Sequence, residues 1–169
     1  MEAQGFRGRI WALWNKEELT VKIIQPHEQF ITVEIKRRRQ AKWLFTVVYA
    51  YPHVQERENL WDELQQFATN CTKPWLIGGH FNETISLEER NHGSPDMIRR
   101  CTKFKHWIEN NGLIDLSFMG PKFTWSRGRN WNTMKRARLD RALYTMEWRI
   151  RFQEGWFVTS CSPTRITFL

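Results

Sequence analysis

The sequence predicts an α/β fold in which two β-sheets pack as a sandwich covered by helices. Runs of β-branched and aromatic residues cluster in the first third of the chain, and helical patterns then alternate with further strand-like runs. Hydrophobic residues make up 41% and aromatic residues 14% of the 169 residues, which is enough apolar material for a core. We therefore expect one domain over residues 1–169.

Four strands are expected over residues 9–51, where apolar runs are broken by polar residues. The runs are IWALW, TVKII, FITVEI and WLFTVVYAY, and they are rich in side chains that favour strands. The last two runs flank residues 36–40, whose dense positive charge suits an exposed hairpin turn. This basic segment is either a solubilising loop or a contact for phosphate.

A helix is expected over residues 53–70. Its apolar residues have the spacing of a single buried helix face and are Leu60, Trp61, Leu64, Phe67 and Ala68. The run PWLIGG at residues 74–79 is then typical of a buried strand that ends at a tight glycine turn. The order strand, helix, strand implies a βαβ-like step.

A second helix is expected to begin at Ser94 and Pro95, which suit the N-cap and the first helical position. Its buried face should contain Ile98, Cys101, Phe104 and Ile108. Gly112 is typical of the residue that follows a helix. Beyond this helix, the runs KFTWSRG and ARLDRALY alternate in polarity like a pair of strands.

The formal charge of +8 favours a polyanion such as nucleic acid as the partner, although a basic but inert protein is the alternative.

Cys71, Cys101 and Cys161 have no CxxC or zinc-type spacing, so reduced intracellular thiols are expected. No window approaches the roughly 20 apolar residues of a membrane helix, and no signal-peptide pattern is present. We expect a soluble chain with no membrane partner, and the sequence indicates no protein partner.

His80 and Asn82 follow the buried strand, at the position where α/β sheets assemble their sites. Residues i and i+2 of an extended chain point the same way. His80 and Asn82 should therefore share one face, with Phe81 on the other. A polar turn without a function is the alternative interpretation.

Basic and aromatic residues interleave over residues 122–141, where Asp140 is the one acidic residue. This composition favours a surface that follows phosphates and stacks bases, with binding that weakens in salt. The residues expected to contact nucleic acid are Thr124, Trp125, Arg127, Arg129, Trp131, Arg136 and Arg138. The alternative is a core Trp125 beside a solvated arginine-rich loop.

Four segments stand in a fixed order: VYAYP around Tyr49, GGHFN with its glutamate-rich continuation, GPKFTWSRG, and ARLDRAL around Asp140. Each is common alone, but the four in this order are specific. They resemble the endonuclease domain of plant-type non-LTR (LINE) retrotransposons, in the endonuclease/exonuclease/phosphatase superfamily. The resemblance spans residues 5–158. It implies a DNase I-like sandwich, here a partial domain incomplete at both termini.

The resemblance implies Mg²⁺-dependent hydrolysis of DNA phosphodiesters in the nucleus. The catalytic positions that it implies are Tyr49, His80, Asn82 and Asp140. A carboxylate at position 80 would activate the attacking water, and Asn82 would hold the phosphate or the nucleophile. Tyr49 would donate a hydrogen bond near the phosphate, and Asp140 would orient a histidine that lies further along the chain.

Three departures from the family pattern lead us to expect a catalytically inactive chain. His80 replaces an aspartate, a change that costs a positioned base on the order of 10²-fold to 10⁴-fold in rate. The metal-binding glutamate expected upstream and the Ser-Asp-His triplet expected downstream have no counterpart. We therefore expect Mg²⁺ binding to be lost and Asp140 to lack a histidine partner. The alternative to an endonuclease is a non-enzymatic basic remnant that binds nucleic acid.

Overall fold

The computed structural model describes residues 10, 12–130, 132–155, 157–158 and 167–168. Its elements in chain order are β1 (Leu19–Pro26), β2 (Phe30–Arg37), β3 (Trp43–Tyr49), α1 (Val54–Thr69), β4 (Trp75–His80), the 3-10 turn η1 (Leu87–Glu89), α2 (Pro95–Asn110), β5 (Ile114–Asp115), β6 (Phe118–Met119), β7 (Trp125–Arg127), β8 (Lys135–Ala137), β9 (Asp140–Tyr144), α3 (Met146–Arg151), β10 (Phe157–Val158) and β11 (Thr167–Phe168).

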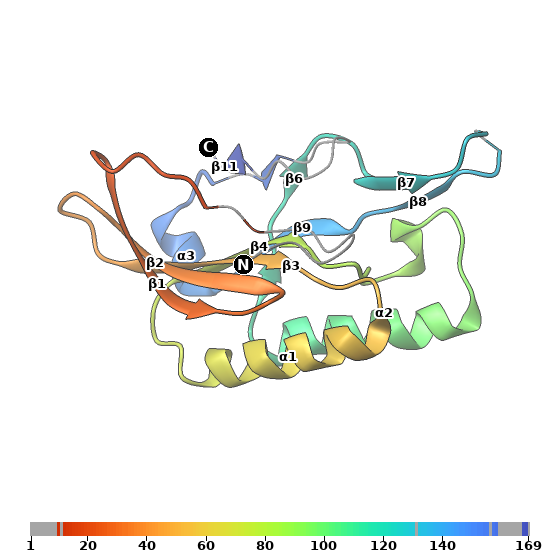
Figure 1. Ribbon diagram of the computed structural model, residues 1–169, viewed down its shortest axis with the longest axis horizontal. Coiled ribbons are helices and arrows are strands. Elements are labelled where there is room, and N and C mark those ends of the chain that lie inside the picture. Colours follow the sequence, from red (N-terminus) through yellow and green to blue (C-terminus); the bar gives the residue numbers. More distant parts are fainter. Residues whose placement is uncertain (1–9, 11, 131, 156, 159–166, 169) are drawn as a thin grey trace.

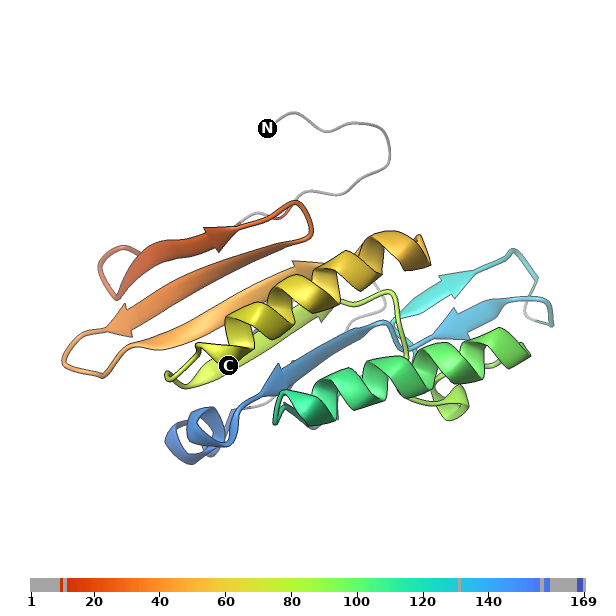
Figure 2. The ribbon, with the colours of Figure 1, turned by 90° about the horizontal axis from the view of Figure 1, so that it is seen from below.

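A six-stranded mixed sheet in the order β1-β2-β3-β4-β9-β5 forms the body of the molecule (Figure 1). β3 and β4 are parallel and are joined by α1, so the predicted βαβ step is confirmed. Helices α1 and α2 lie side by side over one face of this sheet (Figure 2). β6, β10 and β11 form a small sheet on its other side (Figure 1). The two-sheet α/β arrangement expected from the sequence is confirmed.

The main core lies between the large sheet and the two helices. Leu60 and Leu64 of α1 and Phe104 of α2 are fully or almost fully buried against the sheet. Burying such side chains contributes about 1.5–3 kcal/mol each, which outweighs the modest helix propensities of these segments. Packing against the sheet therefore holds both helices in place.

The N-terminal part of the expected strand pattern is wrong. Ile10 and residues 12–14 of the IWALW run form no strand, and Leu13 is 90% exposed. The side chain of Asn15 instead accepts a hydrogen bond from the amide of Glu17 (3.0 Å), and the resulting turn leads into β1. An apolar run becomes a strand only where a partner strand lies beside it.

The expected pair formed by KFTWSRG and ARLDRALY is partly wrong, because the second run divides into two strands. β8 pairs with β7 in a separate hairpin, whereas β9 enters the large sheet between β4 and β5. The chain leaves the hairpin at Arg138, whose amide donates to the carbonyl of Glu89 (2.9 Å). A contact with a distant loop therefore ends β8.

Helix α2 begins at Pro95 as expected, but Ser94 makes no side-chain cap hydrogen bond. Cys101, Phe104 and Ile108 are buried as expected, whereas Ile98 is 55% exposed. The buried face of α2 starts one turn later than the sequence pattern indicates and includes Trp107, whose indole donates to the carbonyl of Trp61 (3.0 Å).

Cys71 is a half-buried free thiol and Cys101 a buried one, whereas Cys161 lies outside the described residues. Burial raises the pKa of the Cys71 thiol.

In the part of the chain that the structure describes, no helix is both long and apolar enough to cross a membrane.

Glu34 of β2 forms ion pairs with two lysines that lie in the segments before β3 and before β4. Its side chain is 8% exposed and accepts hydrogen bonds from Lys42 (2.6 Å) and Lys73. These two ammonium groups lower the pKa of Glu34 from 4.5 to about 2.

Gly79 is required where β4 passes β3. Its φ is +150°, and a Cβ atom at this position would lie 2.0 Å from the carbonyl oxygen of Val48. The strand cannot move away from Val48, because the two residues are register partners in the parallel pair.

We expect Gly79→Ala to lower the free energy of unfolding by at least about 3 kcal/mol, because backbone atoms rather than a flexible side chain block the new Cβ. Gly112→Ala is the matched control. Gly112 also has a positive φ (+60°), but a Cβ atom added there would have no other atom within 4 Å. The control should lose only about 1–2 kcal/mol. Equal losses in urea unfolding would contradict the steric explanation.

We expect Glu34→Gln to destabilise the protein at neutral pH. The lowered pKa means that the stabilisation is present above pH 4.5 and disappears as the pH falls toward about 2. The difference in Tm between the variant and the unchanged chain should therefore shrink across this range. A difference that stays constant from pH 5 to pH 2 would show that the two lysines do not act through the carboxylate charge.

Candidate functional site

The ends of three neighbouring strands bring Tyr49, His80 and Asp140 into one row. Tyr49 is the register partner of His80 across the parallel pair β3 and β4, and His80 is the partner of Asp140 across β4 and β9. The rings of Tyr49 and His80 are stacked, with centroids 5.7 Å apart. Three of the four predicted catalytic residues are therefore adjacent because of strand register alone.

Asn82, the fourth predicted residue, completes a chain of hydrogen bonds. His80 Nδ1 lies 2.9 Å from Asp140 Oδ1, and His80 Nε2 lies 3.1 Å from Asn82 Oδ1. Asn82 Nδ2 donates to the carbonyl oxygen of Ala50 (2.6 Å). The expectation that Asp140 lacks a histidine partner is wrong, because its carboxylate is within hydrogen-bond distance of His80. Solvent still reaches the site, since 15% of the His80 side chain and 22% of the Asp140 side chain are exposed.

The turn after β4 holds His80 and Asn82 on the same side. Asn82 has a φ of +50°, in the left-handed region that asparagine tolerates better than most residues. Phe81 points the other way and is fully buried, with its ring beside those of Trp61 and Phe104. The predicted alternation of these three residues is confirmed, and the buried Phe81 anchors the turn.

Thr124 positions Asp140 from the other side. Its hydroxyl oxygen accepts hydrogen bonds from the backbone amides of Leu139 and Asp140, both at 3.0 Å. Thr124 was expected to contact nucleic acid. Its observed hydrogen bonds give it a structural role at the start of β9, and its contact with nucleic acid stays a prediction.

The hairpin of β7 and β8 extends from the body of the molecule beside the loop that precedes α2 (Figure 1). Arg127, Arg129 and Lys135 are exposed on it, Arg136 is half-buried, and Trp125 is half-buried. Trp131 lies outside the described residues. We call the positively charged residues Arg127, Arg129, Lys135 and Arg136 the basic hairpin.

Asn91, which the sequence did not indicate, attaches the basic hairpin to the rest of the protein. Its side chain donates to the carbonyl of Met134 (2.7 Å) and accepts from the amide of Arg136 (2.7 Å). Its own amide donates to the carbonyl of Arg136 (3.3 Å). The sequence carries no signal for this role, because the partners are more than 40 residues away.

Arg138 was expected on the nucleic-acid surface, but it is only 8% exposed. Its guanidinium pairs with Glu89 and Asp115, both at 3.0 Å. The fully buried Arg141 pairs with the same two carboxylates. A buried guanidinium is committed to these partners, because leaving their charges unpaired would be costly. Arg138 is therefore not part of the proposed surface.

The glutamate-rich segment after Asn82 forms a second buried ion cluster. Glu83 is 4% exposed and pairs with Arg57 (3.0 Å), Arg90 (3.3 Å) and Arg100 (2.9 Å). Burial lowers the pKa of Arg57, and Glu83 opposes this effect. The cluster joins the turn that carries Asn82 to both helices.

The residues at the strand ends do not fit Mg²⁺. This ion prefers carboxylate oxygens in octahedral geometry, usually with several waters. In the described residues, no group of three histidine, cysteine, aspartate or glutamate side chains could hold a metal ion. Asp140 is already paired with His80, and Asn82 Oδ1 is occupied by the other ring nitrogen.

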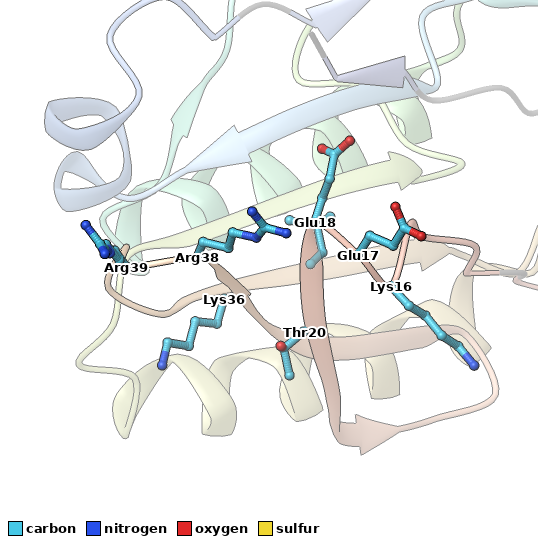
Figure 3. A pocket seen from close by; sticks show the side chains of 8 residues that line it. Lys16, Glu17, Glu18, Thr20, Lys36, Arg38 and Arg39 are labelled. Atoms are coloured by element: carbon cyan, nitrogen blue, oxygen red, sulfur yellow. The ribbon is translucent and has the colours of Figure 1, made fainter.

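The turn predicted for residues 36–40 is confirmed only in part: residues 38–40 connect β2 and β3 at the opposite end of the strands from Tyr49, whereas Lys36 and Arg37 are the last residues of β2. Beside it lies an open hollow of about 210 Å³ (Figure 3). Lys36, Arg38 and Arg39 point in different directions around this hollow (Figure 3). They do not converge on one anion, as a phosphate site requires.

No protein-family model matches the sequence, and a search of curated proteins found no match either. Among solved structures, the chain is similar to the endonuclease domain of TRAS1, a telomere-specific non-LTR retrotransposon, with a TM-score of 0.63 and 15% sequence identity. The match covers 80% of this chain and 59% of that domain. The chain therefore spans only part of the length of the domain it resembles.

Two further structures are similar with lower scores. The human Nocturnin catalytic domain with bound sulfate matches with a TM-score of 0.48 and 13% identity, over 78% of this chain and 50% of that one. The 3′ phosphatase NExo from Neisseria, bound to a product DNA hairpin, matches with a TM-score of 0.48 and 14% identity, over 76% and 58%. The TRAS1 match and the sheet topology together identify the fold of this chain as DNase I-like.

Proposed function

We propose that this chain is a non-enzymatic nucleic-acid-binding protein, derived from the endonuclease of a plant-type non-LTR retrotransposon. The observation that carries this proposal is the exposed basic hairpin, which lies next to strand ends whose polar groups are bound to one another. The order of the four motifs supports the retrotransposon origin. On this proposal residues 1–169 belong to one partial domain, with DNA as the ligand and the nucleus as the location.

The basic hairpin supports binding of the DNA backbone. Arg127, Arg129 and Lys135 are exposed, and none has a carboxylate partner among the described ion pairs. Such cations bind phosphates and release counterions, which makes the affinity strongly salt-dependent. Trp125 is half-buried in the same hairpin, and the aromatic ring of this residue type is suited to stacking on a base.

Hydrolysis of DNA phosphodiesters is the second candidate function. It is favoured by the convergence of Tyr49, His80, Asn82 and Asp140 at the strand ends. A general base, however, needs a free lone pair within reach of the attacking water. Both nitrogens of His80 are already engaged. The donors also do not fit Mg²⁺, so we favour binding without cleavage.

We expect the double variant Arg127→Ala, Arg129→Ala to bind duplex DNA on the order of tenfold more weakly at low salt. The slope of log affinity against log salt concentration should fall by about 1 for each phosphate contact removed. Fluorescence anisotropy at several salt concentrations measures both quantities.

The matched control is Arg99→Ala, Lys105→Ala, which removes two exposed positive charges from α2. This control should bind DNA nearly as well as the unchanged chain. If both double variants lose affinity equally, the basic hairpin is not the binding surface and only the net charge matters.

We expect the unchanged chain not to nick supercoiled plasmid DNA in the presence of Mg²⁺. The assay compares it with a His80→Asp variant, with EDTA as the control and circular dichroism to establish folding. Nicking by the unchanged chain that EDTA abolishes would refute the non-enzymatic proposal. Nicking by the variant alone would locate the loss of activity at position 80.

A further inference from the structure

We infer that His80 is a doubly protonated imidazolium, and that its positive charge allows nucleic acid to approach the strand ends without a divalent metal. The second part of this inference, the approach of nucleic acid, rests on the proposed function. Its first part, the protonation of the ring, depends only on the hydrogen bonds of His80, Asp140 and Asn82.

The two partners of the His80 ring are both acceptors. Asp140 Oδ1, at 2.9 Å from Nδ1, is a carboxylate oxygen, and Asn82 Oδ1, at 3.1 Å from Nε2, is an amide oxygen. A neutral imidazole carries one N–H group, so it satisfies one acceptor and turns a lone pair toward the other. The imidazolium carries two N–H groups and satisfies both.

The orientation of the Asn82 amide follows from its other contact. Asn82 Nδ2 lies 2.6 Å from the carbonyl oxygen of Ala50, which accepts hydrogen bonds and donates none. A flipped amide would offer its NH₂ group to the ring, but it would place two oxygen atoms in contact at Ala50. The observed orientation is therefore the one that pairs every donor with an acceptor.

The surroundings of the ring suit a cation. Asp140 provides the opposite charge, and the stacked ring of Tyr49 presents an aromatic face with its centroid 5.7 Å from that of the imidazole. The pair of imidazolium and carboxylate is neutral as a unit. Two carboxylates at these positions would repel each other and any phosphate, unless a metal cation lay between them.

A short connection joins this neutral strand end to the basic hairpin. β8 ends at Ala137 and β9 begins at Asp140, with Thr124 of the hairpin bonded to the amide of Asp140. A phosphate backbone bound along the hairpin therefore reaches the strand ends next. It meets no net negative charge from the pair formed by His80 and Asp140.

The first test is a ¹⁵N NMR spectrum of the ring nitrogens at pH 7. The His80 signals are assigned as those that disappear in a His80→Gln variant. We expect both nitrogens to give the shifts of protonated imidazolium, each with a directly bonded hydrogen. An unprotonated nitrogen at either position would overturn the inference. This test needs no DNA, so its outcome is independent of the proposed function.

The second test measures DNA affinity at constant ionic strength, in EDTA and in Mg²⁺. The unchanged chain should bind equally in both. His80→Asp should bind on the order of tenfold more weakly in EDTA, because two units of charge change beside the phosphate path. Mg²⁺ should restore much of that loss by screening or bridging the two carboxylates. The control is His106→Asp, the same replacement on the exposed surface of α2, which should change affinity little.

The outcomes separate the two proposals. If the unchanged chain binds DNA only when Mg²⁺ is present, or if His80→Asp binds as well as His106→Asp in EDTA, the inference is wrong although nucleic-acid binding stands. If the folded, unchanged chain binds no DNA under any condition, the proposed function fails and the metal-independent approach of nucleic acid fails with it. The NMR result then still decides the protonation of His80.

Discussion

The parallel pairing of β3 with β4 is the constraint on which the candidate site depends. It places Tyr49 beside His80, and the antiparallel pairing with β9 then places Asp140 on the other side. Gly79 permits this register, because any side chain there would collide with the backbone of Val48. A shift of one residue would turn His80 into the core and bring Phe81 out. The site and the core are therefore specified by the same register.

Buried ion clusters link this sheet to the elements around it. Glu83 forms ion pairs with arginines from α1, from α2 and from the segment that precedes α2, and Glu89 forms ion pairs with Arg138 and Arg141. Burying such charges costs much of what their attraction gains, so they are weak contributors to net stability. Their main effect is on position, because a carboxylate forms hydrogen bonds with a guanidinium only in particular orientations. They determine where the loop after β4 lies, and thus where Asn82 and the base of the hairpin lie.

These clusters also affect how much of the chain's positive charge is available at the surface. Arg138 and Arg141 are buried and share two carboxylates, Glu89 and Asp115, so this pair of arginines adds little to the field that an approaching polyanion meets. The exposed charge that remains near the strand ends belongs largely to the basic hairpin. At the strand ends themselves, His80 and Asp140 are hydrogen-bonded to each other.

The sequence by itself determined the elements whose signals are local. The apolar spacing of α1, the buried strand β4 and the opposite orientations of His80 and Phe81 all follow from periodicity within a few residues, and all were predicted. The expected glycine turn is wrong, because Gly78 and Gly79 lie inside β4 and pair with both neighbouring strands. The order of four motifs indicated the fold, because motif order reflects strand order. Only the tertiary structure decided the long-range pairs. His80 and Asp140 are 60 residues apart, and Asn91 holds a carbonyl 43 residues away. The same basic composition places Arg127 in solvent and Arg138 in the interior. Local patterns record whether a side chain is polar, but its partner and its burial depend on which distant strand the chain meets.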